Sequence, residues 1–165
     1  MNFTFAQFLS LLVVLGGGLS ACQPSLNTEP IPPDLASLKP VIENLGKQWS
    51  NGLQQRDRAV FAQLYDPQAV YLPDSDVTLR GNEAIADYWQ ASFPFLRDIQ
   101  LSMDELEHHN GLLFETGKGI ALIANDSGGN DTLAYKYLNI WKPQANGSYR
   151  VLVDVYNDRP AAADQ

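Results

Sequence analysis

The chain has 165 residues, of which 45% are hydrophobic, and its 11 basic and 19 acidic residues give a net charge of −8. This length corresponds to one domain. The acidic balance excludes nucleic-acid binding, because phosphate contacts need Lys and Arg. It also disfavours adsorption to anionic lipid headgroups. The only cysteine is Cys22, so no disulfide framework is expected.

The N-terminal segment has the pattern of an export signal. No Lys, Arg, Asp or Glu precedes Glu29, and the apolar run Phe8–Leu15 is followed by three glycines. A signal peptide has such an apolar core and then small residues at its cleavage site. The last four residues of this segment, Leu19–Cys22 (Leu-Ser-Ala-Cys), resemble the lipobox of bacterial lipoproteins, in which the cysteine is acylated after cleavage.

That resemblance implies a division of the chain and an address. Residues 1–21 are expected to be the signal peptide, 22–39 the lipidated Cys22 with a Pro-rich tether, 40–157 the globular domain and 158–165 a polar tail. The membrane partner is reached through Cys22, on the exported side of the cell envelope. Gln23, in place of an Asp, implies the outer membrane where the organism has one.

Two other interpretations of the N-terminus remain open. The stretch Phe3–Ala21 is nearly long enough for a transmembrane anchor, and Cys22 on its own is a free thiol. The glycine triplet and the following prolines disfavour a membrane span. A thiol that directly follows a processing site is better explained as the target of acylation.

The first half of the globular region has helical periodicity. The spacing predicts an amphipathic helix over residues 40–55, a second helix capped by Asp57 and ended by Asp66-Pro67, and a third helix capped by Asn82. The apolar residues expected on the buried faces are Val41, Leu45, Trp49 and Leu53, then Val60, Phe61 and Leu64, and then Ile85, Tyr88 and Trp89.

The second half has the period of strands. Residues 69–72 and 77–80 predict two short strands around a turn, and after Phe93 the alternation predicts four long strands at 98–107, 112–124, 133–141 and 149–156. Their connections are rich in Gly, Asn, Asp and Pro, which favours hairpins and antiparallel pairing. Helices followed by a meander predict the α+β class, with a curved antiparallel sheet and helices on one face.

This order resembles the cone-shaped fold shared by nuclear transport factor two, the ketosteroid isomerases and the SnoaL-like cyclases. The local matches resemble the SnoaL-like group of uncharacterised bacterial domains over about residues 40–157. They are Trp49, Gly52, Asp57, Leu64-Tyr65-Asp66, Ala69-Val70, Gly81, Ala84-Ile85, Trp89, Gly117, Trp141-Lys142, Gly147, Tyr149 and Asp154-Val155-Tyr156-Asn157.

The resemblance implies a hollow, apolar pocket between three N-terminal helices and the sheet, and a possible homodimer built through the sheet. Candidate lining residues are Trp49, Tyr71, Trp89, Tyr135, Tyr137, Asp154 and Tyr156. At helical or alternating spacing these aromatic residues also fit plain core packing. The tyrosines are stronger candidates for a binding role, because a buried hydroxyl needs a hydrogen-bond partner that a ligand can supply.

Asp154 is the most suggestive acidic residue, because it lies in the middle of an apolar strand. Alternation places it with Leu152 and Tyr156, opposite the three valines of that strand, and either face could be the inner one. Pointing inward, it would be a carboxylate of raised pKa, suited to act as general base or hydrogen-bond donor. Pointing outward, it would pair across strands with Lys136 or Arg150. Acids from the late strands are also what SnoaL-like cyclases use.

Other candidate sites are weaker. Ketosteroid isomerases place their base just before a proline, but here Leu72 stands before Pro73, and Asp74 and Asp76 fit a turn. His108 and His109 are adjacent on a strand and point to opposite faces, so they predict no metal site. Residues 125–131 have the composition of a calcium loop but lack its spacing, which favours a hairpin turn. We expect neither a metal nor a cofactor.

Three interpretations fit these residues, and in the third the cavity is filled and the sheet surface serves dimerisation or scaffolding. The first is a binding module that holds a small apolar or amphipathic molecule, or a partner protein, without turnover. The second is a cofactor-free cyclase or isomerase that uses Asp154 with a pocket tyrosine such as Tyr135 or Tyr137 as hydrogen-bond donor. Two acid–base groups within hydrogen-bond reach would favour the enzyme, and a dry aromatic cavity would favour binding.

Overall fold

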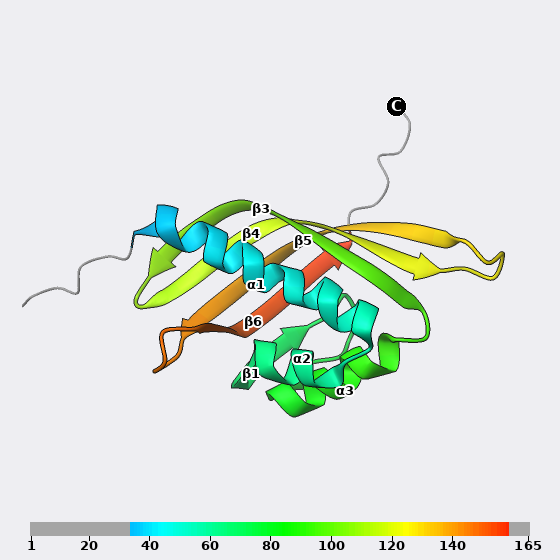
Figure 1. Cartoon of the computed structure of the whole chain (residues 1–165), viewed down its shortest axis with the longest axis horizontal. Coiled ribbons are helices and arrows are strands. Elements are labelled where there is room, and N and C mark those ends of the chain that lie inside the picture. The colour runs from blue at the N-terminus through cyan, green and yellow to red at the C-terminus, as the bar shows by residue number, and fades with distance from the viewer. Residues whose placement is uncertain (1–33, 159–165) are drawn as a thin grey trace, which may run out of the picture. The chain divides into compact units, whose positions relative to one another are not determined.

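A computed structural model describes residues 34–158, which form three helices and a curved six-stranded sheet (Figure 1). This confirms the predicted α+β class. The predicted signal peptide, Cys22 and nearly all of the predicted polar tail lie outside the described residues. The elements are α1 (Leu35–Gln55), α2 (Arg58–Leu64), β1 (Tyr65–Leu72), β2 (Leu79–Arg80), α3 (Asn82–Ser92), β3 (Leu96–His109), β4 (Leu112–Ala124), β5 (Asn130–Pro143) and β6 (Tyr149–Asp158).

The sheet has the strand order β2-β1-β6-β5-β4-β3. The four long strands β3 to β6 form consecutive antiparallel hairpins, as predicted. The exception to the antiparallel prediction is the β1–β6 pair, which is parallel and joins the first strand to the last. The sheet is therefore mostly antiparallel. Helix α1 crosses one face of the sheet and packs there against β3 (Figure 1).

Helix α1 begins at Leu35, five residues before its predicted start, so the end of the predicted tether is helical. The side chain of Asp34 caps it by accepting a hydrogen bond from the Ala36 amide at 3.1 Å. The helix continues through Pro40. None of the described helices has both the length and the apolar character needed to span a bilayer.

The buried face of α1 begins one residue later than the sequence predicts. Ile42 is fully buried, together with Gly46, Trp49 and Leu53, whereas Val41 is 46% exposed. The assignment of Val41 to the buried face was therefore wrong. Positions 42, 46, 49 and 53 keep the three- and four-residue spacing of one helical face. Val41 is apolar as well, so the sequence pattern did not show which of the two residues begins that face.

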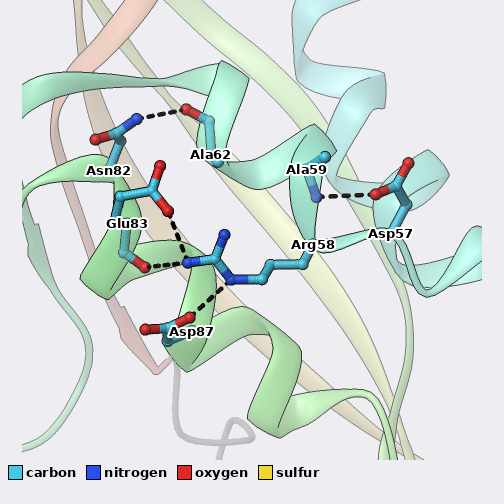
Figure 2. A network of polar contacts seen from close by, with 7 residues as sticks. All are labelled: Asp57, Arg58, Ala59, Ala62, Asn82, Glu83 and Asp87. Carbon is cyan, nitrogen blue, oxygen red and sulfur yellow. Dashed lines mark hydrogen bonds and ion pairs between the residues drawn. The ribbon is translucent and has the colours of Figure 1, made fainter.

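Polar contacts hold α2 against α3 (Figure 2). Asp57 caps α2 as predicted, since its carboxylate accepts a hydrogen bond from the Ala59 amide at 2.8 Å. The guanidinium of Arg58 then donates to Glu83 Oε2 at 2.8 Å and to Asp87 Oδ1 at 2.7 Å, both on α3. One arginine therefore fixes the relative position of the two helices.

Asn82 has a different role from the predicted cap. The N-cap of α3 is Gly81, with a φ of 84° and no side-chain cap bond, a left-handed backbone conformation that favours glycine. The Asn82 side chain instead donates to the Ala62 carbonyl on α2 at 2.9 Å (Figure 2). The predicted helix boundary is correct to one residue, but the polar side chain ties two helices together.

A register shift in the last hairpin decides which residues of β6 face the helices. Trp141 pairs with Val151, but the preceding Ile140 pairs with Val153, so Leu152 is an extra residue. Val151 and Asp154 are consequently both buried, although strict alternation would place them on opposite faces. The prediction that Val151 shares a face with the other valines of β6 is wrong for this reason.

Two glycines on the buried side of α1 give a stability test with opposite expected signs. A Cβ added at Gly52 would lie 2.6 Å from the Phe61 ring, whereas one at Gly46 would lie 3.8 Å from Leu101, an ordinary contact. We expect Gly52→Ala to lower the free energy of unfolding by about 1–3 kcal/mol through overpacking. We expect Gly46→Ala to raise it by about 0.5–1 kcal/mol through helix propensity. Urea denaturation of both variants measures this, and shifts of the same sign would contradict the α1–α2 packing.

Candidate functional site

A cavity of about 270 Å³ lies between the inner face of the sheet and the helices. This volume is at the lower end of small-molecule sites. All seven residues proposed from the sequence lie on its wall, and their role in binding stays a prediction. The wall consists of Trp49, Tyr71, Tyr88, Trp89, Ala91, Ser92, Phe95, Leu96, Ile99, Leu101, Ala121, Ile123, Leu133, Tyr135, Tyr137, Asn139, Asp154 and Tyr156.

A continuous row of aromatic rings forms one side of the cavity. Tyr71 stacks on Trp89 with ring centroids 5.8 Å apart and on Tyr156 at 6.3 Å, and Tyr156 lies 5.2 Å from Tyr135. These rings come from β1, α3, β6 and β5. At the rim Phe95 is 50% exposed. One side of the cavity therefore presents flat aromatic surfaces.

Asp154 points inward, which decides between the two orientations left open by the sequence. It is 6% exposed, and its Oδ2 accepts a hydrogen bond from the Tyr65 hydroxyl at 2.5 Å. The alternative of pairing with Lys136 or Arg150 is therefore wrong. Among the described residues no group donates to the other carboxylate oxygen, Oδ1.

The Tyr65 hydroxyl is a buried junction between helices and strands. Besides donating to Asp154, it accepts hydrogen bonds from Trp49 Nε1 at 3.0 Å and from Trp89 Nε1 at 3.2 Å. Tyr65 itself has no exposed surface. The four side chains come from β1, β6, α1 and α3, so this one oxygen fixes the carboxylate relative to both helices.

Burial controls the ionisation of Asp154 and Tyr65. Desolvation raises the pKa of Asp154, the hydrogen bond from Tyr65 lowers it and the nearby charge of Glu115 raises it, with a net pKa of about 7. Burial and the Asp154 charge raise the pKa of Tyr65 well above its ordinary value. Near neutral pH Tyr65 is thus a neutral hydrogen-bond donor, and Asp154 is present in both its protonated and its ionised form.

A second buried carboxylate, Glu115, lies in the same layer. It is 2% exposed and accepts hydrogen bonds from the Tyr137 hydroxyl and from Trp141 Nε1, each at 2.7 Å. Burial raises its pKa, and these two donors lower it. Tyr137, expected to serve Asp154, therefore donates to Glu115, and Tyr65 occupies the expected position.

Sheet register places the two acids in one row. Glu115 pairs with Asn139, Asn139 with Asp154, and Asp154 with Tyr71, across β4, β5, β6 and β1. Asn139 is 2% exposed, and within residues 34–158 its buried Oδ1 has no hydrogen-bond partner. Of this row, Tyr71, Asn139 and Asp154 line the cavity, and Glu115 lies next to Asn139 in the sheet, outside the cavity lining.

Two glycines of β4 make space for the tyrosine rings of β5. Gly117 pairs with Tyr137 and Gly119 with Tyr135. A Cβ on Gly117 would lie 2.6 Å from the Tyr137 ring, and one on Gly119 would overlap the Tyr135 ring. The rings lie over the bare backbone and leave the cavity open above them. The sequence placed Gly117 mid-strand without identifying this use.

The other sequence candidates lie away from the cavity. Leu72 is half-buried, and Asp74 and Asp76 are exposed in the turn after β1. The loop after β4 is closed by Asn125, whose Oδ1 accepts from the Gly129 amide at 2.9 Å, as expected of a hairpin turn. Within residues 34–158 no cluster of three His, Cys, Asp or Glu residues is placed to hold a metal ion.

Sequence reasoning missed Tyr65, Glu115 and Asn139. Tyr65 was assigned to the helix end because Asp66-Pro67 follows it, although it begins β1. Glu115 had a usable signal, since it alternates with Leu113 and Gly117 on the inward face of β4. Asn139 had the same signal between Tyr137 and Trp141.

The raised pKa of Asp154 predicts a pH-dependent stability. Between the unfolded pKa near 4 and the folded pKa of about 7, the folded state holds a proton that the unfolded state has lost, so stability falls as pH rises. The Asp154→Asn variant has no carboxyl group to ionise at this position, so this fall in stability with rising pH should disappear. We expect the variant to match the wild type near pH 4 and to exceed it above pH 7 by on the order of 4 kcal/mol at most.

Denaturation curves from pH 4 to 8 test this prediction. The control is Asp104→Asn, which changes the net charge equally at an exposed acid paired with Lys118; it should leave the pH profile unchanged. An Asp154→Asn protein that is less stable than the wild type across this range would show that the ionised carboxylate is structural.

Comparison with known proteins identifies the fold. No protein-family model matches the sequence, and a search of curated proteins finds no significant match. Among solved structures, a nuclear transport factor 2-like superfamily protein from Salmonella enterica serovar Typhimurium is similar, with 13% identity and a TM-score of 0.65. The match covers 79% of this chain and 97% of that one.

Two further structures agree. A ketosteroid isomerase-like protein from Erwinia carotovora has 16% identity and a TM-score of 0.63, over 75% of this chain and 98% of that one. A domain of unknown function with a cystatin-like fold from Nostoc punctiforme has 13% identity and a TM-score of 0.65, over 76% and 80%. The described domain therefore has the nuclear transport factor 2-like fold, built as three helices on a curved, unclosed and mostly antiparallel sheet.

Proposed function

We propose that this chain is an exported, lipid-anchored protein whose domain binds a small apolar or amphipathic molecule in the cavity. The observation that carries the proposal is the cavity wall, in which aromatic and aliphatic side chains surround a single carboxylate, that of Asp154. A mostly apolar pocket with few, well-placed polar groups is typical of ligand sites. The resemblance of Leu19–Cys22 to a lipobox supports the anchor.

The contacts of Tyr65 favour binding without turnover. Its hydroxyl has no exposed surface and is shared among three partners. A phenol held in this way, with a raised pKa, is poorly suited to exchange protons with a substrate. It serves instead to position Asp154, which leaves the cavity with one acid rather than a cooperating pair that both reach the ligand.

A second candidate is an isomerase or cyclase that uses Asp154 as general base. It is favoured by the unpartnered Oδ1 on the cavity wall and by a pKa of about 7, which suits proton transfer near neutral pH. If the chain is such an enzyme, Asp154→Asn abolishes turnover of the substrate while the protein stays folded. Retention of turnover in that variant would exclude this candidate.

The ligand proposal predicts a co-purifying molecule. Native mass spectrometry of the chain purified from its host should show added mass that denaturation removes. Ala121→Phe places a ring in the cavity and should abolish that mass. Thr116→Phe, on the exposed face of the same strand, should retain it. Equal retention in both variants, or a wild-type chain without bound mass that also binds no apolar probe, would contradict a ligand site here.

The anchor proposal predicts the location of the protein in cells. Cys22→Ser should release it from membranes in detergent-free fractionation, because the acylated residue is lost and the acidic surface is repelled by anionic lipids. Gln23→Asp keeps the cysteine and should stay membrane-bound, moving to the inner membrane in an enteric host. A Cys22→Ser protein that remains firmly in the membrane fraction would overturn the anchor.

A further inference from the structure

Of the three buried carboxylates, Asp66 pairs with Lys142, whereas Asp154 and Glu115 have no cationic partner within residues 34–158. The donors to Asp154 and Glu115 in the hydrogen-bond network are phenol hydroxyls and indole N–H groups, all neutral. No Lys, Arg or His is among the residues that line the cavity. Buried charges in proteins are usually paired, because an unpaired one is costly. The site thus holds two ionisable acids, and no cationic side chain lines the cavity beside them.

The free oxygen of Asp154 is the place where a counter-charge fits. Tyr65 uses Oδ2, so Oδ1 is the acceptor left within the described residues. The register partner of Asp154, Asn139, also has an unpaired oxygen, Oδ1, which is itself buried. The free acceptor of Asp154 matches a ligand that carries hydrogen-bond donors, such as a protonated amine.

The aromatic wall supplies the other half of the recognition. Tyr71 is paired with Asp154 across β1 and β6, and the rings of Trp89 and Tyr156 each stack with the ring of Tyr71. The faces of such rings attract cations, most strongly where water is excluded. They also offer flat apolar surface to a planar group.

We propose that the cavity selects a small lipophilic organic cation, whose protonated amine binds Asp154 Oδ1 and whose planar apolar part lies against Tyr71, Trp89 and Tyr156. This rests on the proposed ligand-binding function and specifies its ligand class. An anion of the same shape is repelled by Asp154 and Glu115. A neutral molecule of the same shape gains only the apolar contact.

The affinity for an amine should rise with pH as Asp154 loses its proton, between about pH 6 and 8. Glu115 is the only other carboxylate in the row of register partners. From α1 and α3, Trp49 and Trp89 face the Tyr65–Asp154 pair and carry no charge. The remaining titratable groups around Asp154 are phenols with raised pKa, and they are Tyr65, Tyr71, Tyr88, Tyr135, Tyr137 and Tyr156.

Three probes of one shape test the charge preference: naphthylmethylamine, naphthylmethanol and naphthoate. Each is titrated by calorimetry at pH 7.5 into the purified full chain in lipid nanodiscs, with empty nanodiscs as blank. We expect the amine to bind at least about tenfold more tightly than the alcohol, as a desolvated charge pair requires, and naphthoate to bind most weakly. In Asp154→Asn the amine should lose this advantage over the alcohol. Asp104→Asn, with the same change of charge outside the cavity, should bind like the wild type.

The outcomes separate the two proposals. If the alcohol or naphthoate binds the wild type as tightly as the amine, the cation inference is overturned and ligand binding stands. The inference is likewise overturned if the amine keeps its advantage in Asp154→Asn, whose folding is checked by its melting curve. If none of the three probes binds and no molecule co-purifies, the ligand-binding function falls together with the inference.

Discussion

The Tyr65 hydroxyl is the point on which the arrangement of this domain depends. It joins one carboxylate and two indole N–H groups, from three different elements, around a single buried oxygen on β1. Each such hydrogen bond contributes only about 0.5–1.5 kcal/mol net. Removal of the oxygen, however, would leave three polar groups buried without partners, each at a larger cost. The hub therefore determines where α1 and α3 lie relative to the last strand, and with them the opening of the cavity.

A second consequence of this hub is electrostatic. The neutral donors that surround Asp154 and Glu115 stabilise their ionised forms without cancelling their charge. Burial acts in the opposite direction and raises both pKa values. The balance leaves Asp154 able to gain or lose a proton near neutrality. A single bound group can then shift Asp154 towards its protonated or its ionised form. This property is expected of a recognition site and equally of a general base.

Much of the fold could be predicted from the sequence, because hairpins carry their own local signals. The β4 strand was expected at residues 112–124 and is found there, since turn residues flank it on both sides. The parallel β1–β6 pair left no such signal, because its two strands are far apart in the chain and share no turn. Tyr65 was missed for a related reason, since the Asp-Pro that follows it resembles a helix end and the bulged strand it begins has no clean alternation.

The candidate site was predicted in composition but not in its contacts. Aromatic residues at alternating positions were correctly placed on the cavity wall. The direction of Asp154 could not be read from β6, because both faces of that strand are apolar and the extra residue Leu152 changes the alternation. Which tyrosine meets which acid depends on the relative position of β1, β4 and β5, and that is a property of the assembled sheet.

The parallel pairing of β1 with β6 also has a consequence for how the chain folds during synthesis. The strand that completes the sheet is the last one to be made, and β1 must wait for it, so this part of the domain closes only through a contact of long sequence separation. Hairpins β3 to β5 can form earlier, but they leave the edge next to β6 unpaired. A nascent chain of this topology therefore keeps that edge open until residues 149–158 have left the ribosome.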